Sequence, residues 1–306
     1  MYKRMLVLLD GSKLAEVVFS YVRELSGRLS LDIDLLHVCS PQEAEQLYMR
    51  QAYIEHMTEL LRVQSEEVRS TIGDQPPKKK VIEAKGKVVI GYPPDEILKY
   101  ADENSVDIIM LATHGFSGIR RWGLGSVADK VIHEAKVPTW LVPAQLHEDI
   151  LYDKTPQRIV LVPLDGSKLA EEIIPHVKEL TKQRGVETDI RLVHVAKPKE
   201  VSVPPKEKEL IGEDVTAFRT TGEIYLEGLV QQLRDAGFQA QAEQLIGDPA
   251  EEIVRYATKY HPRLIAMSTH GRAGFSRFVF GSVTENVLRR LQKTPVFLVR
   301  PLEKVA

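Results

Sequence analysis

The sequence predicts an α/β protein built from two doubly wound domains, each with a parallel sheet flanked by helices. Two observations lead to this fold class. The word "DGSKLAE" occurs twice, at Asp10–Glu16 and again at Asp165–Glu171, an offset of 155 residues. In both halves, short apolar segments of strand length alternate with segments that have helical start and stop signals. Such alternation is typical of strands joined by right-handed helical crossovers.

The repeat extends through nearly the whole chain of 306 residues. "RMLVLLDGSKLAE" matches "RIVLVPLDGSKLAE", and "DIIMLATHGFSG" matches "RLIAMSTHGRAG", at offsets of 155 to 156. Self-similarity of this length, seen twice, indicates a duplicated domain rather than a solenoid. We expect domains at 1–147 and 155–306, separated by a polar segment that ends in Pro156. The stretches at about 40–80 and 197–232 do not match and are expected to be insertions.

Each element of the first copy follows from a local signal. Wholly apolar runs predict strands that are covered on both faces. Ser12 is a good N-cap for a helix, and Pro93 fits the first turn of another. The expected strands are Met5–Leu9, Leu31–Cys39, a third that ends near Val89 or Ile90, Val106–Ala112 and Thr139–Val142. The expected helices run from about Lys13 to Leu25, over a variable length after the second strand, from Pro93, and from about Val127 to Ala135.

Composition bounds the function. Acidic residues number 43 and basic residues 41, so no global field attracts nucleic acid or anionic membranes. No segment approaches the ~20 consecutive apolar residues of a membrane span. The one cysteine, Cys39, lies in an apolar stretch and is expected to be buried. A disulfide within the chain is impossible, which fits a reducing compartment, and we expect a cytoplasmic protein.

Candidate site residues follow the first strand of each copy. Ligands of doubly wound sheets bind beyond the carboxyl ends of the strands, where the strand order reverses. Asp10 and Asp165 close the first strands at that edge. Each carboxylate can accept hydrogen bonds from ribose hydroxyls or an exocyclic amine, or it can accept amides of the turn that follows. Neither a dinucleotide fingerprint nor a P-loop is present.

The glycines lie after the fourth strand instead. Both copies have a glycine, nine residues, and then Gly-Ser at a predicted helix start: Gly115 with Gly125 and Ser126, and Gly271 with Gly281 and Ser282. Glycines let backbone amides approach a ligand closely, and a helix N-terminus favours an anion, so the pattern predicts a phosphate site. The alternative is a capping box, in which each serine pairs with the acidic residue three positions on.

The sequence gives no clear pattern for a metal site or for nucleophilic catalysis. His114 and His270 lie in the motif "THG", where a hydrogen bond to the backbone is favoured over a metal. No carboxylate or cysteine stands at ligand spacing near them, so we expect no metal site. No nucleophile and base can be paired, and no G-x-S-x-G is present.

These motifs resemble the universal stress protein family. Its ATP-binding members carry G-x2-G-x9-G-[ST], which here reads Ala112-x2-Gly115-x9-Gly125-Ser126 and Ser268-x2-Gly271-x9-Gly281-Ser282. The resemblance covers both halves and implies a tandem member. It implies a five-stranded parallel sheet of order 3-2-1-4-5 in each half. Family members commonly pair through the fifth strand, so the two copies are expected to pair with each other, and a homodimer is a further expectation.

The resemblance also implies a ligand and its contacts. ATP or another adenine nucleotide, with or without Mg²⁺, would be the cofactor. Asp10 and Asp165 would meet the ribose or adenine. Val38 and Val195, at the ends of the second strands, would lie by the adenine. The phosphates would be held in each copy by the glycines and the serine of the motif, together with the first motif position and its histidine: Ala112, His114, Gly115, Gly125, Ser126, Ser268, His270, Gly271, Gly281 and Ser282.

The preferred function is therefore an ATP-binding protein of stress response or signalling, with at most slow hydrolysis. The alternative is a nucleotide-free interaction module, because Ala112 and Ser268 replace the first glycine of the motif. A third class, ATP pyrophosphatases of related fold, carries an S-G-G-x-D-S loop after the first strand. This chain has "DGSKLAE" there, so that class is disfavoured.

Overall fold

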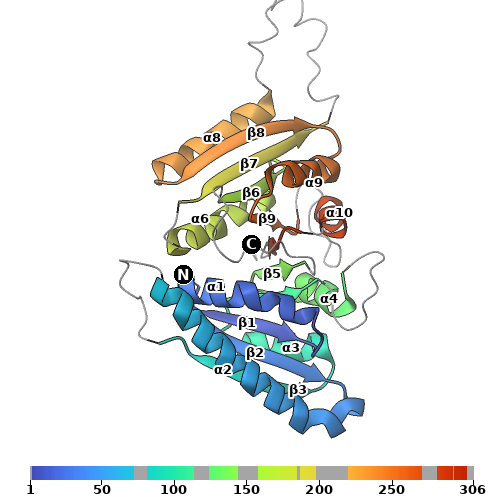
Figure 1. Cartoon of the computed structure of the whole chain (residues 1–306). Coiled ribbons are helices and arrows are strands. Elements are labelled where there is room, and N and C mark those ends of the chain that lie inside the picture. The colour runs from blue at the N-terminus through green and yellow to red at the C-terminus, as the bar shows by residue number, and fades with distance from the viewer. Residues whose placement is uncertain are drawn as a thin grey trace, which may run out of the picture.

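The two halves of the chain build one continuous ten-stranded sheet with helices on both faces (Figure 1). The computed structural model describes residues 2–71, 81–113, 124–143, 158–184, 187–197, 220–270, 281–291 and 293–301. In these ranges the first repeat contains elements β1 to β5, and the second contains β6 to β10. The predicted boundary between the domains lies within 144–157, outside the described residues.

The strands of the first repeat are β1 (Arg4–Leu9), β2 (Asp32–Cys39), β3 (Ala84–Ile90), β4 (Ile108–Ala112) and β5 (Thr139–Val142). Its helical elements are η1 (Ala15–Val18), α1 (Phe19–Leu29), η2 (Pro41–Gln46), α2 (Leu47–Thr71), α3 (Pro93–Glu103) and α4 (Ser126–Glu134). The strands of the second repeat are β6 (Ile159–Leu164), β7 (Asp189–Ala196), β8 (Gln239–Ile246), β9 (Leu264–Ser268) and β10 (Val296–Val299). Its helices are α5 (Lys168–Glu171), α6 (Ile173–Arg184), α8 (Thr221–Asp235), α9 (Pro249–Tyr260) and α10 (Ser282–Arg290).

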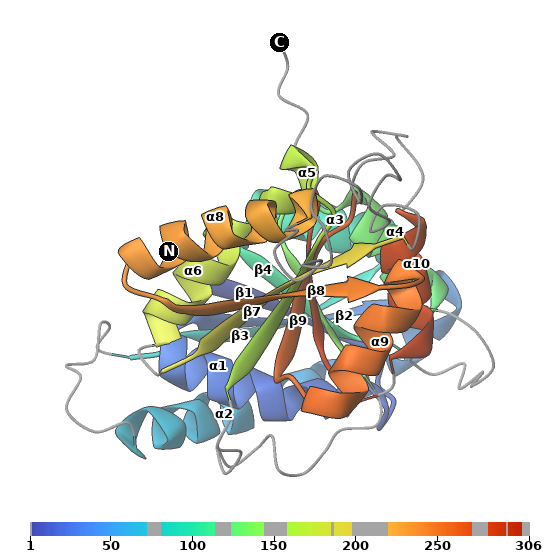
Figure 2. The same cartoon turned by 90° about the horizontal axis from the view of Figure 1, so that it is seen from above.

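The order of the sheet is β3-β2-β1-β4-β5-β10-β9-β6-β7-β8. Each repeat therefore has the predicted order 3-2-1-4-5, and its strands pair in parallel. The expected pairing of the two copies through their fifth strands is also present, because β5 and β10 are antiparallel neighbours. Figure 2 shows the twist of this sheet, whose outer strands run across one another.

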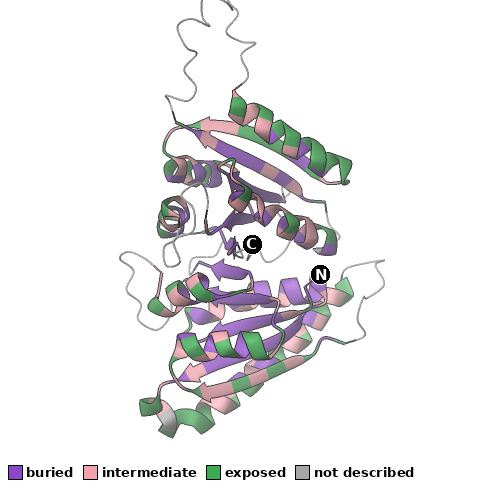
Figure 3. Cartoon of the chain, turned by 180° about the vertical axis from the view of Figure 1, so that it is seen from behind, coloured by how far each residue is buried: buried purple, intermediate pink, exposed green. Residues whose placement is uncertain are grey.

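Side chains of successive strand residues point to opposite faces and fill two cores. On β1, Met5, Val7 and Leu9 belong to the core beneath α1 and α2, while Leu6 and Leu8 belong to the core beneath α3 and α4. Each core continues into the second repeat. Burial is concentrated on the central strands, whereas the edge strands β3 and β8 are partly exposed (Figure 3).

The first helix of the first copy differs from its prediction. The sequence predicts a helix from about Lys13 to Leu25, but a short 3-10 helix, η1, comes first and α1 extends to Leu29. Ser12 was expected to be an N-cap, and its counterpart Ser167 is one in the second copy. The Ser167 side chain accepts a hydrogen bond from the backbone N–H of Ala170. Ser12 makes the matching contact to Ala15 N at 3.2 Å. The local capping bond is therefore the same in both copies, although the helix that follows is not.

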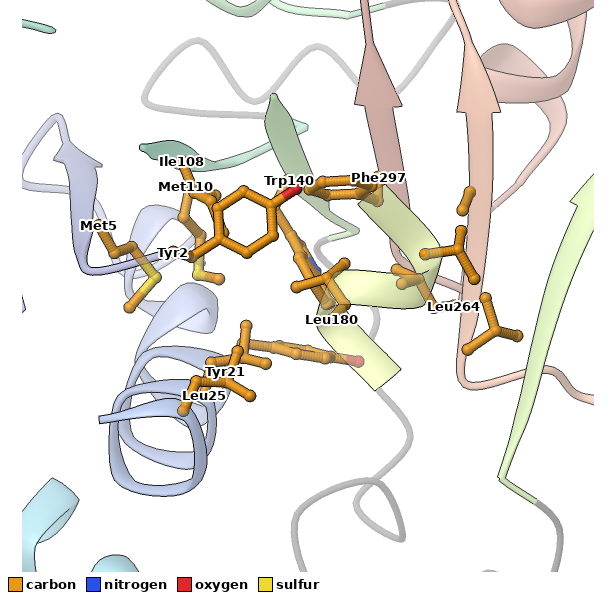
Figure 4. Packing of buried hydrophobic residues seen from close by; sticks show 14 of the residues in the cluster. Tyr2, Met5, Tyr21, Leu25, Ile108, Met110, Trp140, Leu180, Leu264 and Phe297 are labelled. Atoms are coloured by element: carbon orange, nitrogen blue, oxygen red, sulfur yellow. The ribbon is translucent and has the colours of Figure 1, made fainter. Parts of the chain in front are cut away.

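Packing at the junction of the repeats centres on aromatic rings (Figure 4). The ring centroids of Trp140 on β5 and Phe297 on β10 are 5.5 Å apart in an edge-to-face arrangement. Tyr2 packs edge-on to Phe297 at 6.4 Å. Its hydroxyl lies 2.6 Å from Nδ1 of His176 on α6. Burial lowers the pKa of this histidine, so the ring is neutral and its Nδ1 accepts a hydrogen bond from the phenol.

Polar contacts also cross this junction. Arg263 Nη2 and Glu24 Oε1 lie 2.5 Å apart, with both side chains almost fully buried. The Gln183 amide exchanges hydrogen bonds with the backbone of Tyr2 and donates to Leu29 O. A buried ion pair whose partners come from different repeats favours this one docking geometry: without it Arg263 would lose this partner, although Glu24 would keep Arg28 of its own helix at 3.2 Å.

We expect Phe297→Ala to lower the free energy of unfolding by about 3–5 kcal/mol, since the side chain is fully buried between the repeats and its removal leaves a cavity. Urea unfolding monitored by circular dichroism measures this. Ile224→Ala is the control, because Ile224 on α8 is 59% exposed and its truncation should change stability by less than roughly 0.5 kcal/mol. Equal stability of the two variants would contradict the central role of Phe297.

Candidate functional site

A cavity of about 290 Å³ opens in the second repeat at the carboxyl ends of its strands. It lies where β6 and β9 are neighbours, which is the point where the strand order of this repeat reverses. The cavity is lined by Pro163, Leu164, Asp165, Ala170, Val193, His194, Val195, Lys197, Pro249, Ile253, Met267, Ser268, His270, Gly281, Ser282, Val283 and Thr284. Apolar side chains thus form most of the wall, and polar groups converge on it from the strand ends and from α10.

The cavity brings together every predicted site residue of the second repeat that the structure describes. These residues are Asp165, Val195, Ser268, His270, Gly281 and Ser282. Gly271 lies outside the described residues. Residues that are 117 positions apart, Asp165 and Ser282, therefore share one wall because the parallel strands end at the same edge.

The "DGS" turn fixes the aspartate. Asp165 Oδ1 accepts from the backbone N–H of Ser167 at 2.9 Å, and Asp10 Oδ1 accepts equally from Ser12. Gly166, between Asp165 and Ser167, has a φ of +83°, a conformation that favours glycine. The alternative role of the aspartates, as acceptors for amides of the turn, is therefore observed. This bond holds the Asp165 carboxylate in the lining of the cavity.

The start of α10 contradicts the capping-box interpretation. Gly281 is the N-cap, and Ser282 is the first residue of the helix, so Ser282 does not stand at the cap position that the box requires. The first copy is the same, with Gly125 as N-cap and Ser126 as the first residue of α4. The serine hydroxyl instead belongs to the exposed first turn, where backbone amides have no partner within the helix.

The glycine at this N-cap is not needed for its backbone angles. Its φ is −56° at Gly281 and −61° at Gly125, which any residue can adopt. The Gly281 N–H donates to Thr269 O at 2.9 Å, and a Cβ there would lie 3.3 Å from that same oxygen. The missing side chain keeps α10 close to β9 and leaves space in the cavity.

The residues around the end of β9 are tied together by short contacts. The His270 N–H donates to Ser268 Oγ at 3.4 Å, and its ring Nδ1 lies 2.9 Å from Thr269 Oγ1. Thr284 Oγ1 donates to Ser268 O at 3.2 Å, which links α10 to β9. The hydroxymethyl of Ser268 therefore fits at the first motif position and orders the chain that follows it.

The first repeat places its described site residues at the equivalent positions. Asp10 follows β1, Val38 lies near the end of β2, and Ala112 ends β4. Gly125 and Ser126 open α4, with the Gly125 N–H 3.3 Å from Thr113 O. His114 and Gly115 lie outside the described residues.

Val38 and Val195 are partly buried against the core beneath α3 and α9. The histidine before each valine is buried, and His37 Nδ1 lies 2.9 Å from Leu9 O. Burial lowers the pKa of His37, so the ring is neutral at pH 7 and Nδ1–H donates to this carbonyl.

Sequence reasoning missed several residues of the site. Lys197, one residue beyond β7, lines the cavity and supplies a positive charge at the same edge as the α10 N-terminus. Pro249 and Ile253 of α9 close one wall. The position of Lys197 directly after a predicted second strand was a usable signal, whereas nothing local marks Ile253.

No group of three or more histidine, cysteine, aspartate or glutamate side chains is arranged to hold a metal ion among the described residues. No helix in the described part of the chain combines the length and apolar character that crossing a membrane requires.

The chain belongs to the universal stress protein family. The model of that family matches twice, over residues 1–143 and 157–300, so the tandem arrangement is confirmed. Both matches include the "DGS" turn and the Gly-Ser helix start.

Similarity to individual proteins agrees with this assignment. The chain is 30% identical to universal stress protein MJ0577 of Methanocaldococcus jannaschii over 154 residues, which is 46% of this chain and 93% of that protein. It is 27% identical to universal stress protein Rv2005c of Mycobacterium tuberculosis, covering 72% of this chain and 70% of that protein. The crystal structure of a universal stress protein from Archaeoglobus fulgidus shares the fold, with a TM-score of 0.67, 20% identity, and coverage of 97% and 98% of the two chains.

Gly166→Ala tests the origin of the "DGS" turn. We expect it to lower the free energy of unfolding by about 1–2 kcal/mol, because a Cβ is strained at a φ of +83°. Gly228→Ala on α8 is the matched control: a Cβ there meets no atom within 4 Å, and it should raise stability by about 0.5–1 kcal/mol. Chemical denaturation measures both. A Gly166→Ala protein as stable as the parent would show that the turn does not need glycine.

Proposed function

We propose that the chain is a nucleotide-binding stress or signalling protein that holds ATP or a related adenine nucleotide in the cavity of its second repeat. The observation that carries this is the convergence of Asp165, Ser268, Gly281 and Ser282 on one cavity at the topological switch point. The motif that supplies three of these residues is the one by which the chain resembles ATP-binding family members.

The two ends of the cavity suit the two ends of a nucleotide. Val195, Ile253 and Met267 offer apolar surface for a base. The Asp165 carboxylate can accept hydrogen bonds from ribose hydroxyls while its Oδ1 stays bonded to the turn. The base and ribose would therefore lie over the ends of β6 and β7.

The anionic tail would lie at the start of α10. The first amides of the helix and the hydroxyl of Ser282 are donors, and the helix dipole favours negative charge there. Lys197 adds a positive charge to the same cavity. Since Gly281 N–H is already bonded to Thr269 O, the amides that a phosphate would use begin at Ser282.

We propose binding rather than catalysis. Asp165 is the only carboxylate among the described lining residues, and its Oδ1 already accepts from the turn. Hydrolysis of a phosphate chain needs a base positioned on the attacking water. Among the described lining residues, no other carboxylate is available to act as that base beside the α10 N-terminus.

Nucleotide binding is expected to raise the free energy of unfolding by about 2.7 kcal/mol when free ATP is at 100 times its dissociation constant. The melting temperature, measured with ATP and with ATP plus Mg²⁺, reports this shift. Chromatography of small molecules released from the denatured purified protein provides an independent readout. If ATP leaves the melting temperature unchanged and no adenine nucleotide is released, the proposal is wrong and the nucleotide-free interaction module is the better account.

Gly281→Val tests where the phosphates of the proposed ligand bind. The φ of −56° accepts valine, and the side chain would occupy the space between α10 and β9 that we assign to the phosphates. We expect ATP affinity at the second repeat to fall at least about tenfold, a loss of roughly 1.4 kcal/mol or more, measured by titration calorimetry. Gly228→Ala, remote from the cavity, should bind like the parent. If Gly281→Val binds ATP as tightly as the parent, the phosphates do not bind at this position.

A further inference from the structure

The first repeat places a cationic side chain over its "DGS" turn, beside the counterparts of residues that line the cavity of the second repeat. Arg50 of α2 extends over the "DGS" turn, so that a Cβ added to Gly11 would overlap its Nη1 and would lie 3.3 Å from its Cζ. The ring atom Cε1 of His37 is 3.9 Å from the same point. The guanidinium therefore covers the turn that holds Asp10.

Helix α2 holds Arg50 there. Three residues on, Tyr53 donates its hydroxyl to Glu16 Oε1 at 2.7 Å, which ties α2 to η1 directly after the turn. Ile54 is fully buried against β3, where Gly86 leaves room for it: a Cβ at Gly86 would come within 2.7 Å of Ile54 Cγ2. Residues three positions apart share a helix face, so Arg50 points to the same side as Tyr53.

The guanidinium lies in a polar and charged environment. Arg50 Nη2 donates a long hydrogen bond of 3.3 Å to Gln46 Oε1. The charges of Arg50, Glu43 and Asp10 all act on the ring of His37, whose Cε1 faces the same turn. Attraction to carboxylates of this kind favours a guanidinium at this position.

The surrounding residues are the counterparts of the cavity wall in the second repeat. Asp10 and His37 correspond to Asp165 and His194, which line the open cavity there. Helix α8 begins with Thr221, and it is Gly222 that approaches His194: a Cβ at Gly222 would lie 2.7 Å from His194 Nδ1. In the described part of the second repeat, a glycine thus lies against this histidine, while in the first an arginine lies beside it.

We propose that Arg50 fills the nucleoside end of the first site and makes the two sites unequal, so that the second repeat binds the more tightly and the first accepts only ligands with an anionic tail. A nucleoside must displace the guanidinium from its place over the "DGS" turn and offers it no charge in return. A nucleotide supplies phosphates to which the same guanidinium can turn. The inference rests on the proposed function and specifies its selectivity.

The test measures adenosine and ATP binding with Gly281→Val and Asp165→Ala present throughout, which weaken the phosphate end and the nucleoside end of the second site. We expect Arg50→Ala to raise adenosine affinity about tenfold and to shrink the ratio of ATP to adenosine affinity by at least as much. Arg62→Ala is the matched control, since Arg62 lies on the same helix in an exposed pair with Glu59. Arg50→Gln, which keeps most of the side-chain length without the charge, should gain less for adenosine than Arg50→Ala.

Two results would overturn the inference. If Arg50→Ala leaves adenosine affinity unchanged, Arg50 does not occupy the nucleoside end. If it weakens ATP and adenosine equally, Arg50 is a ligand contact rather than an occupant. Failure of the proposed function is separate, because then the parent chain, whose second site is intact, would itself bind no adenine nucleotide. Equal unfolding midpoints for Arg50→Ala and Arg62→Ala establish that neither change acts through misfolding.

Discussion

The antiparallel contact between β5 and β10 is the constraint on which the rest of the structure depends. Its register pairs Leu141 with Val296, Trp140 with Phe297 and Thr139 with Leu298. Trp140 and Phe297 are the second residues of their strands, so the contact pairs equivalent positions around one central aromatic pair. That is the geometry of a self-complementary dimer interface, realised within one chain. It removes the fifth-strand edges that each repeat would otherwise expose.

Joining the sheets in this way also determines what the cores contain. Each face of the ten-stranded sheet is covered by helices from both repeats, and each core runs across the junction. The buried Arg263–Glu24 pair and the contacts of Gln183 with Tyr2 lie beside the aromatic pair and come from opposite repeats. Because these groups satisfy one another only when the repeats are docked, the junction is specific as well as apolar.

Much of the fold could be predicted because its signals are local or repeated. The buried strands are apolar runs bounded by turn residues, and Thr139–Val142 was predicted to the residue. The sheet order and the fifth-strand contact came from family resemblance and not from periodicity, since pairing between distant strands leaves no local trace. The division of the first helix into η1 and α1 was missed because the local signal does not reveal it. Ser12 and Ser167 make the same capping bond, although the helices that follow them differ.

Site residues could be predicted where the backbone conformation requires a residue type. They could not be predicted where a residue is needed only because a larger side chain would not fit. The glycine of "DGS" is required by its φ, so the turn could be read from the sequence. Gly281 has ordinary angles, and only coordinates show that the missing Cβ matters. Arg50 could not be found at all, because it comes from a stretch in which the two copies do not match.

That unmatched stretch is where the two copies differ beside the proposed ligand site, because in the first repeat it places Arg50 over the "DGS" turn. The matching segments form the sheet, the junction and the "DGS" and Gly-Ser turns, and a change in any of them would disturb a core that both repeats share. In the first repeat the described part of the chain between the second and third strands, η2 and α2, packs against β2, β3 and α1. It leaves the sheet at the carboxyl end of β2, beside Asp10, and in the first repeat it returns as α2 with Arg50 over the turn. Substitutions on the exposed side of such a segment cost little stability, and at Arg50 they lie at the edge of the sheet where we propose that the ligand binds. Divergence between the repeats at this position would therefore alter the proposed binding while the shared cores stay the same.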